Sequence, residues 1–339
     1  MAARLDQPFA AGTWDTPAGP VPRVEAALRP ADHRGALLVR LRIRRNEYKV
    51  DPGLYALGAP SPTSPVLVTA SYKLSFDTLR AALPGLDAWI LVLDTAGINV
   101  WCAAGKGTFG TDELCARVEA ARLAEVVSHR TLVLPQLGAS GVTAHQVPPR
   151  TGFRVRWGPV EAADLPAFLA ADGRAEAAMR VKRFPLRERA VLIPVEGVGA
   201  LRYAGPAVAA LVLAAALTPA PWATRAGIAA AAVTAGLVGG LVLAPLGLPW
   251  LPGRAFALKG LWAGLGAALL PVALAWGRLG PAGLLGGLCL CAAIASFLAL
   301  NFTGCSTFTS LSGVRRELHV SIPFIVAGAV VGVFGLLVG

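Results

Sequence analysis

The segment Trp89-Ile-Leu-Val-Leu-Asp94 is a continuous apolar run that ends in a carboxylate. Runs of this kind form strands that are buried on both faces, which is typical of parallel sheets. Two further apolar runs, Val66–Ala70 and Thr131–Leu134, lie on either side of it in the chain and predict neighbouring strands. The alternating segment Phe153–Trp157 predicts a strand at the edge of the same sheet.

Helical segments separate these predicted strands. Ser75 is expected to cap one helix, and Thr111 is expected to cap a second helix over residues 112–128. Residues 165–171 and 175–183 are also predicted to be helical. The alternation of strands and helices predicts a doubly wound, Rossmann-like α/β sheet.

The predicted sheet domain occupies residues 63–200 and follows a Pro-rich N-terminal extension over residues 1–62. In doubly wound sheets, ligands bind beyond the carboxyl ends of the strands. In this chain those ends are Ala70, Asp94 and Leu134. The sequence therefore places a candidate site in the segments that follow these three residues.

The last 139 residues have the composition of a membrane domain. The chain has 339 residues and is 15% charged, whereas a soluble domain is about 25% charged. Residues 1–200 carry 24 basic and 19 acidic side chains, but residues 201–339 carry only seven basic and one acidic. Uncompensated charges are costly in hydrocarbon, so this composition predicts a transmembrane domain. The five apolar runs long enough to span a bilayer are residues 204–219, 224–243, 256–276, 281–300 and 322–338.

Basic residues in the connections between these runs predict the orientation. With five spans, Arg202, Arg254, Lys259, Arg315 and Arg316 lie on the side of the sheet domain, and Arg225 and Arg278 lie on the other side. The positive-inside rule then predicts a multi-pass protein of the cytoplasmic membrane with its sheet domain in the cytoplasm. The first residues, Met1–Pro8, contain no apolar stretch of the kind a signal peptide needs.

The net charge of +11 does not indicate a nucleic-acid partner. The two basic segments, Arg40–Arg45 and Arg180–Arg183, have no interleaved aromatic residues and belong to a domain attached to a membrane. Anionic head groups or an acidic protein partner are the expected contacts of these segments.

The residues after Asp94 carry the candidate chemistry. They read Thr95-Ala-Gly-Ile-Asn-Val-Trp-Cys-Ala-Ala-Gly-Lys-Gly-Thr-Phe-Gly-Thr111. Gly105–Gly110 matches GxGxxG, but ten residues separate it from the strand and no acid follows the next strand, which disfavours a dinucleotide site. A P-loop needs Gly at position 100 and Ser or Thr at position 107, where this chain has Val100 and Gly107.

Cys102 is the candidate ligand in this segment. It lies at the predicted binding edge, and Lys106 together with the following helix N-terminus would favour its thiolate. A thiolate is a soft, strongly donating metal ligand. The alternative is that Cys102 is a small buried packing residue, as most free cysteines are. The residues alone leave both interpretations open.

The segment Asn99-Val-Trp-Cys-Ala-Ala-Gly-Lys106 resembles the cap-helix signature of the corrinoid proteins of microbial mercury methylation, the HgcA family. It is also similar to the corresponding region in the large subunit of the corrinoid iron–sulfur protein of acetyl-CoA synthesis. A soluble corrinoid domain fused to five spans is the architecture of the mercury-methylation family. The other segments that carry the resemblance are Tyr48–Tyr55, Ser64–Ala70, Tyr72–Phe76, Gly107–Asp112 and Asn301–Val314.

The resemblance implies a cobalamin-type corrinoid bound with its lower base displaced, and it implies that Cys102 is the catalytic residue and the lower axial ligand of cobalt. A thiolate in that position favours transfer of a methyl group to an electrophile such as Hg(II), since the axial ligand tunes a cofactor's electronics. The implied enzyme is a corrinoid-dependent methyltransferase that forms methylmercury. The alternative is a corrinoid methyl carrier of a one-carbon, acetyl-CoA-type pathway with a different acceptor. The residues implied to bind the cofactor are Thr69, Asn99, Val100, Trp101, Cys102, Ala103, Ala104, Gly105, Lys106 and Gly107.

The other cysteines do not provide an iron–sulfur site. Only Cys102 and Cys115 lie in the predicted sheet domain, whereas a [4Fe–4S] cluster generally needs four thiolates. The family therefore implies a ferredoxin-like [4Fe–4S] partner, HgcB, as the source of electrons, and a methyl-folate as methyl donor. Cys115, Cys289 and Cys291 are expected to be packing residues, and a mercury or cluster contact at Cys305 is the less favoured alternative for that residue.

A histidine ligand to cobalt is not expected. The chain has no DxHxxG motif, in which a histidine replaces the lower base of the corrinoid. The four histidines are isolated in the sequence and are expected to be surface or packing residues; they are His33, His129, His145 and His319.

Overall fold

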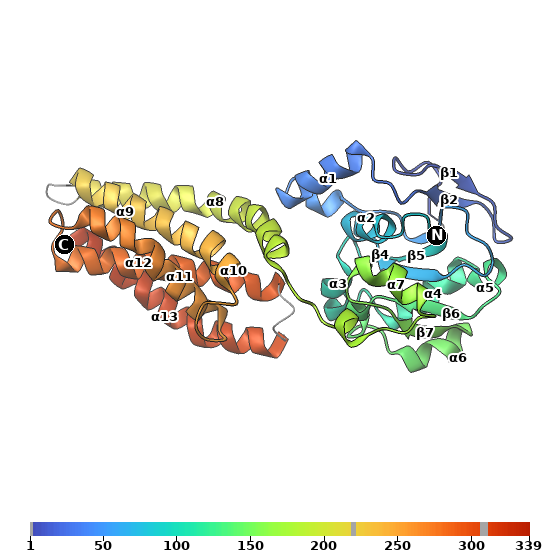
Figure 1. Cartoon of the computed structure of the whole chain (residues 1–339). Helices are drawn as coiled ribbons and strands as arrows, with labels where there is room; N and C mark the ends of the chain where they lie inside the picture. The colour runs from blue at the N-terminus through green and yellow to red at the C-terminus, as the bar shows by residue number, and fades with distance from the viewer. Residues whose placement is uncertain (1–2, 218–221, 306–310) are drawn as a thin grey trace. The chain divides into compact units, whose positions relative to one another are not determined.

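The structure is a computed structural model that describes residues 3–217, 222–305 and 311–339, except for the side chains of residues 215, 304, 305 and 311. It has two compact units (Figure 1). The sheet unit is Met1–Val39 with Ile43–Arg183, and the helical unit is Arg40–Arg42 with Phe184–Gly339. The main division of the chain thus falls at Phe184, ahead of the boundary expected near residue 200.

The sheet unit contains one mixed sheet of seven strands in the order β1-β2-β3-β5-β4-β6-β7. Its strands are β1 (Gly12–Trp14), β2 (Val21–Val24), β3 (Gly53–Leu57), β4 (Val66–Ala70), β5 (Ala88–Leu93), β6 (Thr131–Leu134) and β7 (Arg154–Trp157). The four strands predicted from the sequence are present, they pair in parallel, and β7 lies at the edge. Strand β3 runs antiparallel to β5 and β1 runs antiparallel to β2, so the sheet is mixed, a feature that the sequence did not predict. Strands β1–β3 come from residues 1–62, and all five residues of β3 are buried.

Helices cover both faces of the sheet, as in a doubly wound domain. They are α1 (Pro30–Arg40), α2 (Lys73–Ala81), α3 (Val100–Lys106), α4 (Thr111–Ala120), α5 (Leu123–Val126), α6 (Val147–Thr151) and α7 (Leu165–Ala170). Short 3₁₀ turns lie at η1 (Arg45–Glu47), η2 (Gln136–Gly138), η3 (Ala144–Gln146), η4 (Ala162–Asp164) and η5 (Ala177–Arg180). Side chains alternate along a strand, so Val68 and Ala70 pack with α3, α4 and α5, while Leu67 packs with α2 and α7 on the opposite face.

Several predicted helix boundaries were wrong. The helix expected over residues 112–128 is interrupted at Arg122, which has a left-handed backbone (φ 45°) and separates α4 from α5. Residues 175–183 contain only the η5 turn. Gly110, and not Thr111, is the N-cap of α4. Helix α2 begins at Lys73, before the expected cap at Ser75.

A buried cluster of charges explains why α2 begins at Lys73. The Nζ atom of Lys73 lies 2.7 Å from Asp32 and 2.6 Å from Asp77, and Arg80 lies 2.7 Å from Asp32 and 2.9 Å from Asp77. All four side chains are buried. Arg80 also donates a hydrogen bond of 2.7 Å to the main-chain carbonyl of Glu25. These contacts therefore hold the segment from Glu25 to Asp32 against α2.

We expect the cluster to make the sheet unit sensitive to acid. Burial opposes ionisation of Asp32, but hydrogen bonds from Lys73 and from the main-chain N–H of Arg29 outweigh it and lower the pKa of Asp32 to about 2. Because this pKa is depressed in the folded protein, the stabilisation is complete above about pH 4 and is lost as the pH falls towards 2, which amounts to about 2 kcal/mol. Denaturant unfolding followed by near-ultraviolet circular dichroism should show this loss.

The control for this prediction is a carboxylate in a surface ion pair. Asp112 contacts Arg150 at 2.6 Å, but its side chain is 94% exposed. Asp32→Asn should remove the acid-dependent step and destabilise the protein at pH 7, whereas Asp112→Asn should change neither. An unchanged step in Asp32→Asn would contradict the assignment.

Among the described residues of the helical unit, five helices are long and apolar enough to cross a membrane. Its elements are α8 (Leu186–Ala216), α9 (Trp222–Val238), the π-helical turn η6 (Gly239–Leu243), α10 (Ala244–Gly247), α11 (Phe256–Ala275), α12 (Pro281–Asn301), η7 (Phe302–Cys305) and α13 (Leu311–Val338). These helices coincide with the five predicted runs, although α8 and α13 begin earlier. Residues 218 and 219, the last two of the first predicted run, lie outside the described residues.

Close packing of small residues holds these helices together. Helix α12 is central and packs against α9, α11 and α13 (Figure 1). Its buried residues are mostly small and include Gly283, Gly286, Gly287, Ala292, Ala293, Ala295, Ser296 and Ala299. Small residues let helix backbones approach closely in lipid, where hydrophobic burial does not drive helix association.

Charged groups near the helix ends are satisfied by main-chain atoms. The Nζ atom of Lys259 donates hydrogen bonds of 2.6 Å to the carbonyls of Leu248 and Leu251. The carboxylate of Glu317 accepts a hydrogen bond of 2.8 Å from the N–H of Ala257, in the first turn of α11. Since buried charges need partners, these contacts suit helix ends at the border of a membrane.

Two glycines of α11 provide a matched test of this packing. A Cβ atom at Gly264 would lie 2.7 Å from the Cβ of Ala295, whereas a Cβ atom at Gly266 would meet nothing within 4 Å. We expect Gly264→Ala to destabilise the helical unit by about 1–3 kcal/mol through overpacking. Gly266→Ala should be neutral or stabilising by up to about 1 kcal/mol, because Ala is the better helix former. Thermal unfolding in detergent measures both, and equal effects would contradict the packing described here.

Candidate functional site

Three parallel strands bring their carboxyl ends to one edge of the sheet. Strands β4, β5 and β6 end at Ala70, Leu93 and Leu134, and β4 pairs in parallel with both of the others. Residues 94–107, here called the cap segment, leave β5 at this edge and contain α3. Helix α3 packs against β4 and against η2, which follows β6. The three segments singled out in the sequence therefore meet.

Two buried hydroxyl residues join the exits of β4 and β5. The N–H of Thr95 donates to Oγ of Ser71 over 3.1 Å, and the N–H of Ser71 donates to Oγ1 of Thr95 over 3.2 Å. The N–H of Gly97 donates to the same Ser71 oxygen at 3.1 Å, and Oγ1 of Thr95 donates to the carbonyl of Ile98 at 2.6 Å. We call Ser71 and Thr95 with these hydrogen bonds the hydroxyl clamp. It was not predicted from the sequence, although each of the two residues directly follows a predicted strand.

The chain then turns sharply before α3. Ala96 and Gly97 both have left-handed backbones, with φ of 54° and 75°. The carboxylate of Asp94 accepts a hydrogen bond of 3.0 Å from the N–H of Ala96. The carboxylate of Glu113 accepts a hydrogen bond of 2.7 Å from the N–H of Asp94. Asp94 therefore shapes the turn.

Asn99 fixes the start of α3, which carries Cys102. Its Oδ1 accepts a hydrogen bond of 2.9 Å from the N–H of Cys102, an N-cap of the usual kind. Gly107 ends the helix in a left-handed conformation with φ of 82°. The cap segment is therefore fixed at both ends of its helix.

Helix α3 has one buried and one open face. Ala103 and Ala104 are buried in the core, and a Cβ atom at Gly141 would lie 2.8 Å from the Cα of Ala104. Residues three and four apart share a helix face, so Cys102, Gly105 and Lys106 lie together on the other side. Gly105 and Lys106 are exposed there.

Cys102 is a half-buried free thiol on this open face. A Cβ atom at Gly105 would meet nothing within 4 Å, so the surface beside the thiol is clear. No three of the described His, Cys, Asp and Glu side chains are grouped so that they could hold a metal ion. The arrangement therefore offers one soft donor, and it does not form a multi-residue metal centre.

The remaining predicted cofactor-binding residues are placed as follows. Trp101 and Val100 are half-buried in the first turn of α3, near Cys102, and Gly107 is exposed at its end. Thr69 is buried in β4, and strand alternation gives it the same sheet face as Leu67, opposite the face that α3 covers. The structure brings residues 99–107 together, but it does not bring Thr69 to them.

The glycines of the GxGxxG match do not form a phosphate-binding loop after the strand. Gly105 lies within α3, Gly107 ends this helix and Gly110 precedes α4. The pattern therefore marks the junction of two helices.

The other cysteines are packing residues where their side chains are described. Cys115 is buried in α4, and burial raises the pKa of its thiol. Cys291 is buried between α11 and α12, with its Sγ 3.1 Å from the carbonyl of Gly264, and Cys289 is half-buried. The side chain of Cys305 and residues 306–310 lie outside the described residues.

The fold and this edge belong to a region with known relatives. Residues 39–169 match the model of the CdhD family, described as the CO dehydrogenase/acetyl-CoA synthase delta subunit. The matched region contains β3–β7 and the whole cap segment. It ends before Phe184, where the long apolar helices of the helical unit begin.

Several individual relatives are named gamma subunits of the acetyl-CoA decarbonylase/synthase complex. The protein of Methanopyrus kandleri is 34% identical over 131 residues, which are 38% of this chain and 28% of that relative. The proteins of Archaeoglobus fulgidus and Methanocaldococcus jannaschii are each 32% identical over 127 residues, or 37% of this chain. These alignments cover 27% and 26% of the two relatives, so the chain spans only about a quarter of the length of the proteins that it matches.

The N-cap of α3 can be tested by the reactivity of Cys102. Asn99→Ala removes the acceptor for the Cys102 N–H and should destabilise the helix start by about 1 kcal/mol. We expect faster alkylation of Cys102 by a maleimide, because the first turn opens more often. Asn99→Asp retains an acceptor and should behave like the unchanged protein. Equal alkylation rates in all three proteins would contradict the capping role.

Proposed function

We propose that the sheet unit is a corrinoid-binding domain that takes part in methyl transfer, with Cys102 as the lower axial ligand of cobalt. The observation that carries this proposal is the free, half-buried thiol on the open face of a helix that is fixed at both ends. The resemblance of the segment Asn99–Lys106 to corrinoid cap helices supports it. The similarity of residues 39–169 to the CdhD family supports it as well.

The residues of the cap segment suit a base-off corrinoid. A single thiol can replace the lower base, and the missing side chain at Gly105 leaves open space beside it. When bound, the corrinoid would supply a cobalt centre that carries a methyl group. Asn99 fixes the first turn so that Cys102 is presented in one position, and Trp101 offers an apolar surface next to it. Lys106 lies one turn further along α3, on the same helix face as Cys102.

The names of the relatives favour a role in a one-carbon pathway. They are named as subunits of acetyl-CoA decarbonylase/synthase complexes. On this reading the protein is a methyl carrier, and a protein of the acetyl-CoA-forming type accepts the methyl group. A methyl-folate is the proposed donor to cobalt.

Mercury is the second candidate acceptor, and the helical unit favours it. A corrinoid domain followed by five membrane-spanning helices is the architecture of HgcA, and five such helices follow the sheet unit here. The chain has only two cysteines in the sheet unit, too few for its own [4Fe–4S] cluster. In this proposal a ferredoxin-like partner such as HgcB reduces cobalt, the sheet unit faces the cytoplasm, and Hg(II) is the substrate.

The cofactor assignment is tested by the visible spectrum of the full-length protein reconstituted with cobalamin in detergent. We expect a corrinoid spectrum that changes in Cys102→Ala, because the sulfur donor is lost. Cys115→Ala is the matched control, since Cys115 is buried in α4, and it should keep the original spectrum. A protein that binds no cobalamin would overturn the proposal, and identical spectra in all three proteins would overturn the ligand assignment.

Turnover assays separate the two acceptors. The reconstituted protein would be given a methyl-folate, a reduced ferredoxin and either Hg(II) or an acetyl-CoA synthase. Methylmercury formed in the first assay, with a loss of at least about 100-fold in Cys102→Ala, would establish the mercury methyltransferase. Methyl transfer only in the second assay would establish the one-carbon carrier.

A further inference from the structure

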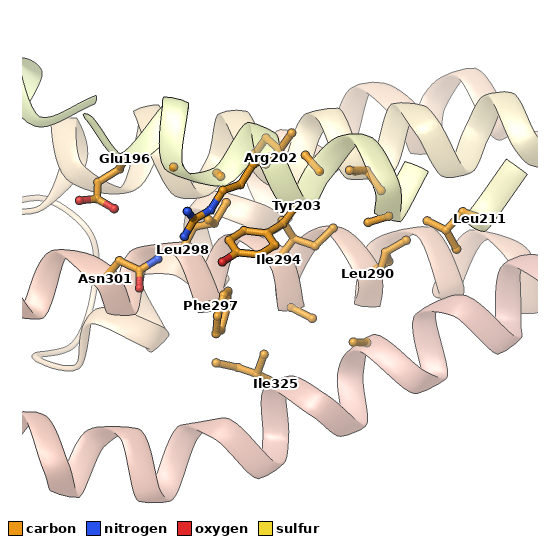
Figure 2. A pocket seen from close by; sticks show the side chains of 18 of the residues that line it. Glu196, Arg202, Tyr203, Leu211, Leu290, Ile294, Phe297, Leu298, Asn301 and Ile325 are labelled. Atoms are coloured by element: carbon orange, nitrogen blue, oxygen red, sulfur yellow. The ribbon is translucent and has the colours of Figure 1, made fainter. Parts of the chain in front are cut away.

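A groove of about 770 Å³ lies within the helical unit, between α8, α9, α12 and α13. This volume falls in the range of about 300–1,000 Å³ that is typical of small-molecule sites. Figure 2 shows the side chains that α8, α12 and α13 contribute to the lining of this groove. The apolar side chains that line it include Leu211, Leu290, Ile294, Phe297 and Ile325.

Polar side chains gather at one end of this groove. Glu196, Arg202 and Asn301 lie at the same end in Figure 2, and Leu211 and Leu290 lie at the other. The Arg202 guanidinium is held 4.5 Å from the centre of the Tyr203 ring, a favourable cation–π contact. The groove therefore has an amphipathic lining with a polar and an apolar end.

The charges at the polar end leave one cation uncompensated. Glu196 is ion-paired with Arg42, with an N–O distance of 3.6 Å, and both belong to the helical unit. Among the described residues Arg202 forms no ion pair with a carboxylate. A cation within a membrane-spanning helix is costly unless it reaches the interface or a partner. A phosphate group is a partner that an arginine can bind through two parallel hydrogen bonds.

The length of the groove matches one leaflet of a bilayer. Along α8 its lining extends from Glu196 to Leu211, fifteen residue steps that span about 22 Å of helix. One leaflet is about 20–22 Å thick with its headgroup region, of which about 15 Å is hydrocarbon. An acyl chain that enters the groove from the polar end would reach close to the bilayer midplane.

We propose that the groove binds one glycerophospholipid with a net negative headgroup, with an acyl chain along the apolar wall and the phosphate at Arg202 and Asn301. The exposed Arg315 and Arg316 lie at the start of α13, at the same end of the bundle as Asn301, where α12 ends. By the positive-inside rule this end faces the cytoplasm, and the cytoplasmic leaflet carries the anionic lipids. The site is independent of the chemistry proposed for the sheet unit.

Native mass spectrometry of the full-length protein released from nanodiscs tests this assignment. The nanodiscs would contain phosphatidylglycerol and phosphatidylcholine of equal chain length in equal amounts. We expect one phosphatidylglycerol retained per chain, with at least about tenfold preference over phosphatidylcholine, because the cationic choline of the latter compensates the charge of its phosphate and is repelled by Arg202. Arg202→Gln should reduce the retention of phosphatidylglycerol by about the same factor.

Matched variants separate the groove from the general charge of the interface. Arg316→Gln removes an exposed cation at the same end but outside the groove lining, and it should retain the lipid. Ala207→Phe fills the groove from α8, whereas Ala209→Phe lies on the opposite side of that helix. We expect retention to be lost in the first and kept in the second.

Three results would overturn the proposal. They are equal retention of both lipids, equal losses in Arg202→Gln and Arg316→Gln, and a stable dimer without bound lipid whose groove is covered by a second copy of the chain. Thermal unfolding of each variant in detergent shows whether it is folded. If Arg202→Gln fails to fold, Arg202→Lys replaces it. This variant keeps the positive charge but not the bidentate geometry, so it should retain the lipid more weakly than the unchanged protein.

Discussion

Parallel pairing of β4 with β5 and β6 is the constraint on which the site depends. It places three chain exits at one edge of the sheet, and the hydroxyl clamp of Ser71 and Thr95 ties two of these exits together. Because the clamp also holds the turn at Gly97, α3 can begin only where Asn99 caps it. The position of Cys102 therefore follows from strand pairing and from a few hydrogen bonds of the main chain.

The two units achieve stability by different physical means. The sheet unit buries large apolar side chains on both faces of a sheet, and it adds a buried ionic cluster around Asp32 and Arg80. The helical unit has few large buried side chains and relies on close contact of small residues, as at Gly264 and Ala295. This difference is expected between a unit that folds in water and a unit whose helices are long and apolar enough to cross a membrane, since hydrophobic burial drives folding in water but not helix association in lipid.

The strands β4–β7 and the long apolar helices were predictable because each depends on a continuous apolar or alternating pattern. Val66–Ala70 and Thr131–Leu134 are strands with the predicted bounds. Strands β1–β3 were not predicted, because they are held by tertiary contacts such as that of Arg80 with the carbonyl of Glu25. The early start of α2 has the same origin, since a buried ion pair across the fold leaves no local signal.

The candidate site was predictable in part. The apolar strand before Asp94 located the sheet edge that carries the cap segment, and family resemblance singled out residues 99–107. The clamp and the strained turn at Ala96 depend on two loops that are distant in sequence, so no local pattern announced them. Thr69 lies one residue before the end of β4. Because side chains alternate along a strand, it lies on the face of the sheet opposite to α3.

The central claim is that the sulfur of Cys102 binds cobalt from below the corrinoid. Cobalt K-edge X-ray absorption of the cobalamin-reconstituted, full-length protein measures this ligand directly. The account predicts one cobalt–sulfur scattering path in the unchanged protein and in Cys115→Ala, and its absence in Cys102→Ala. A cobalt environment of nitrogen and oxygen alone in the unchanged protein would contradict it.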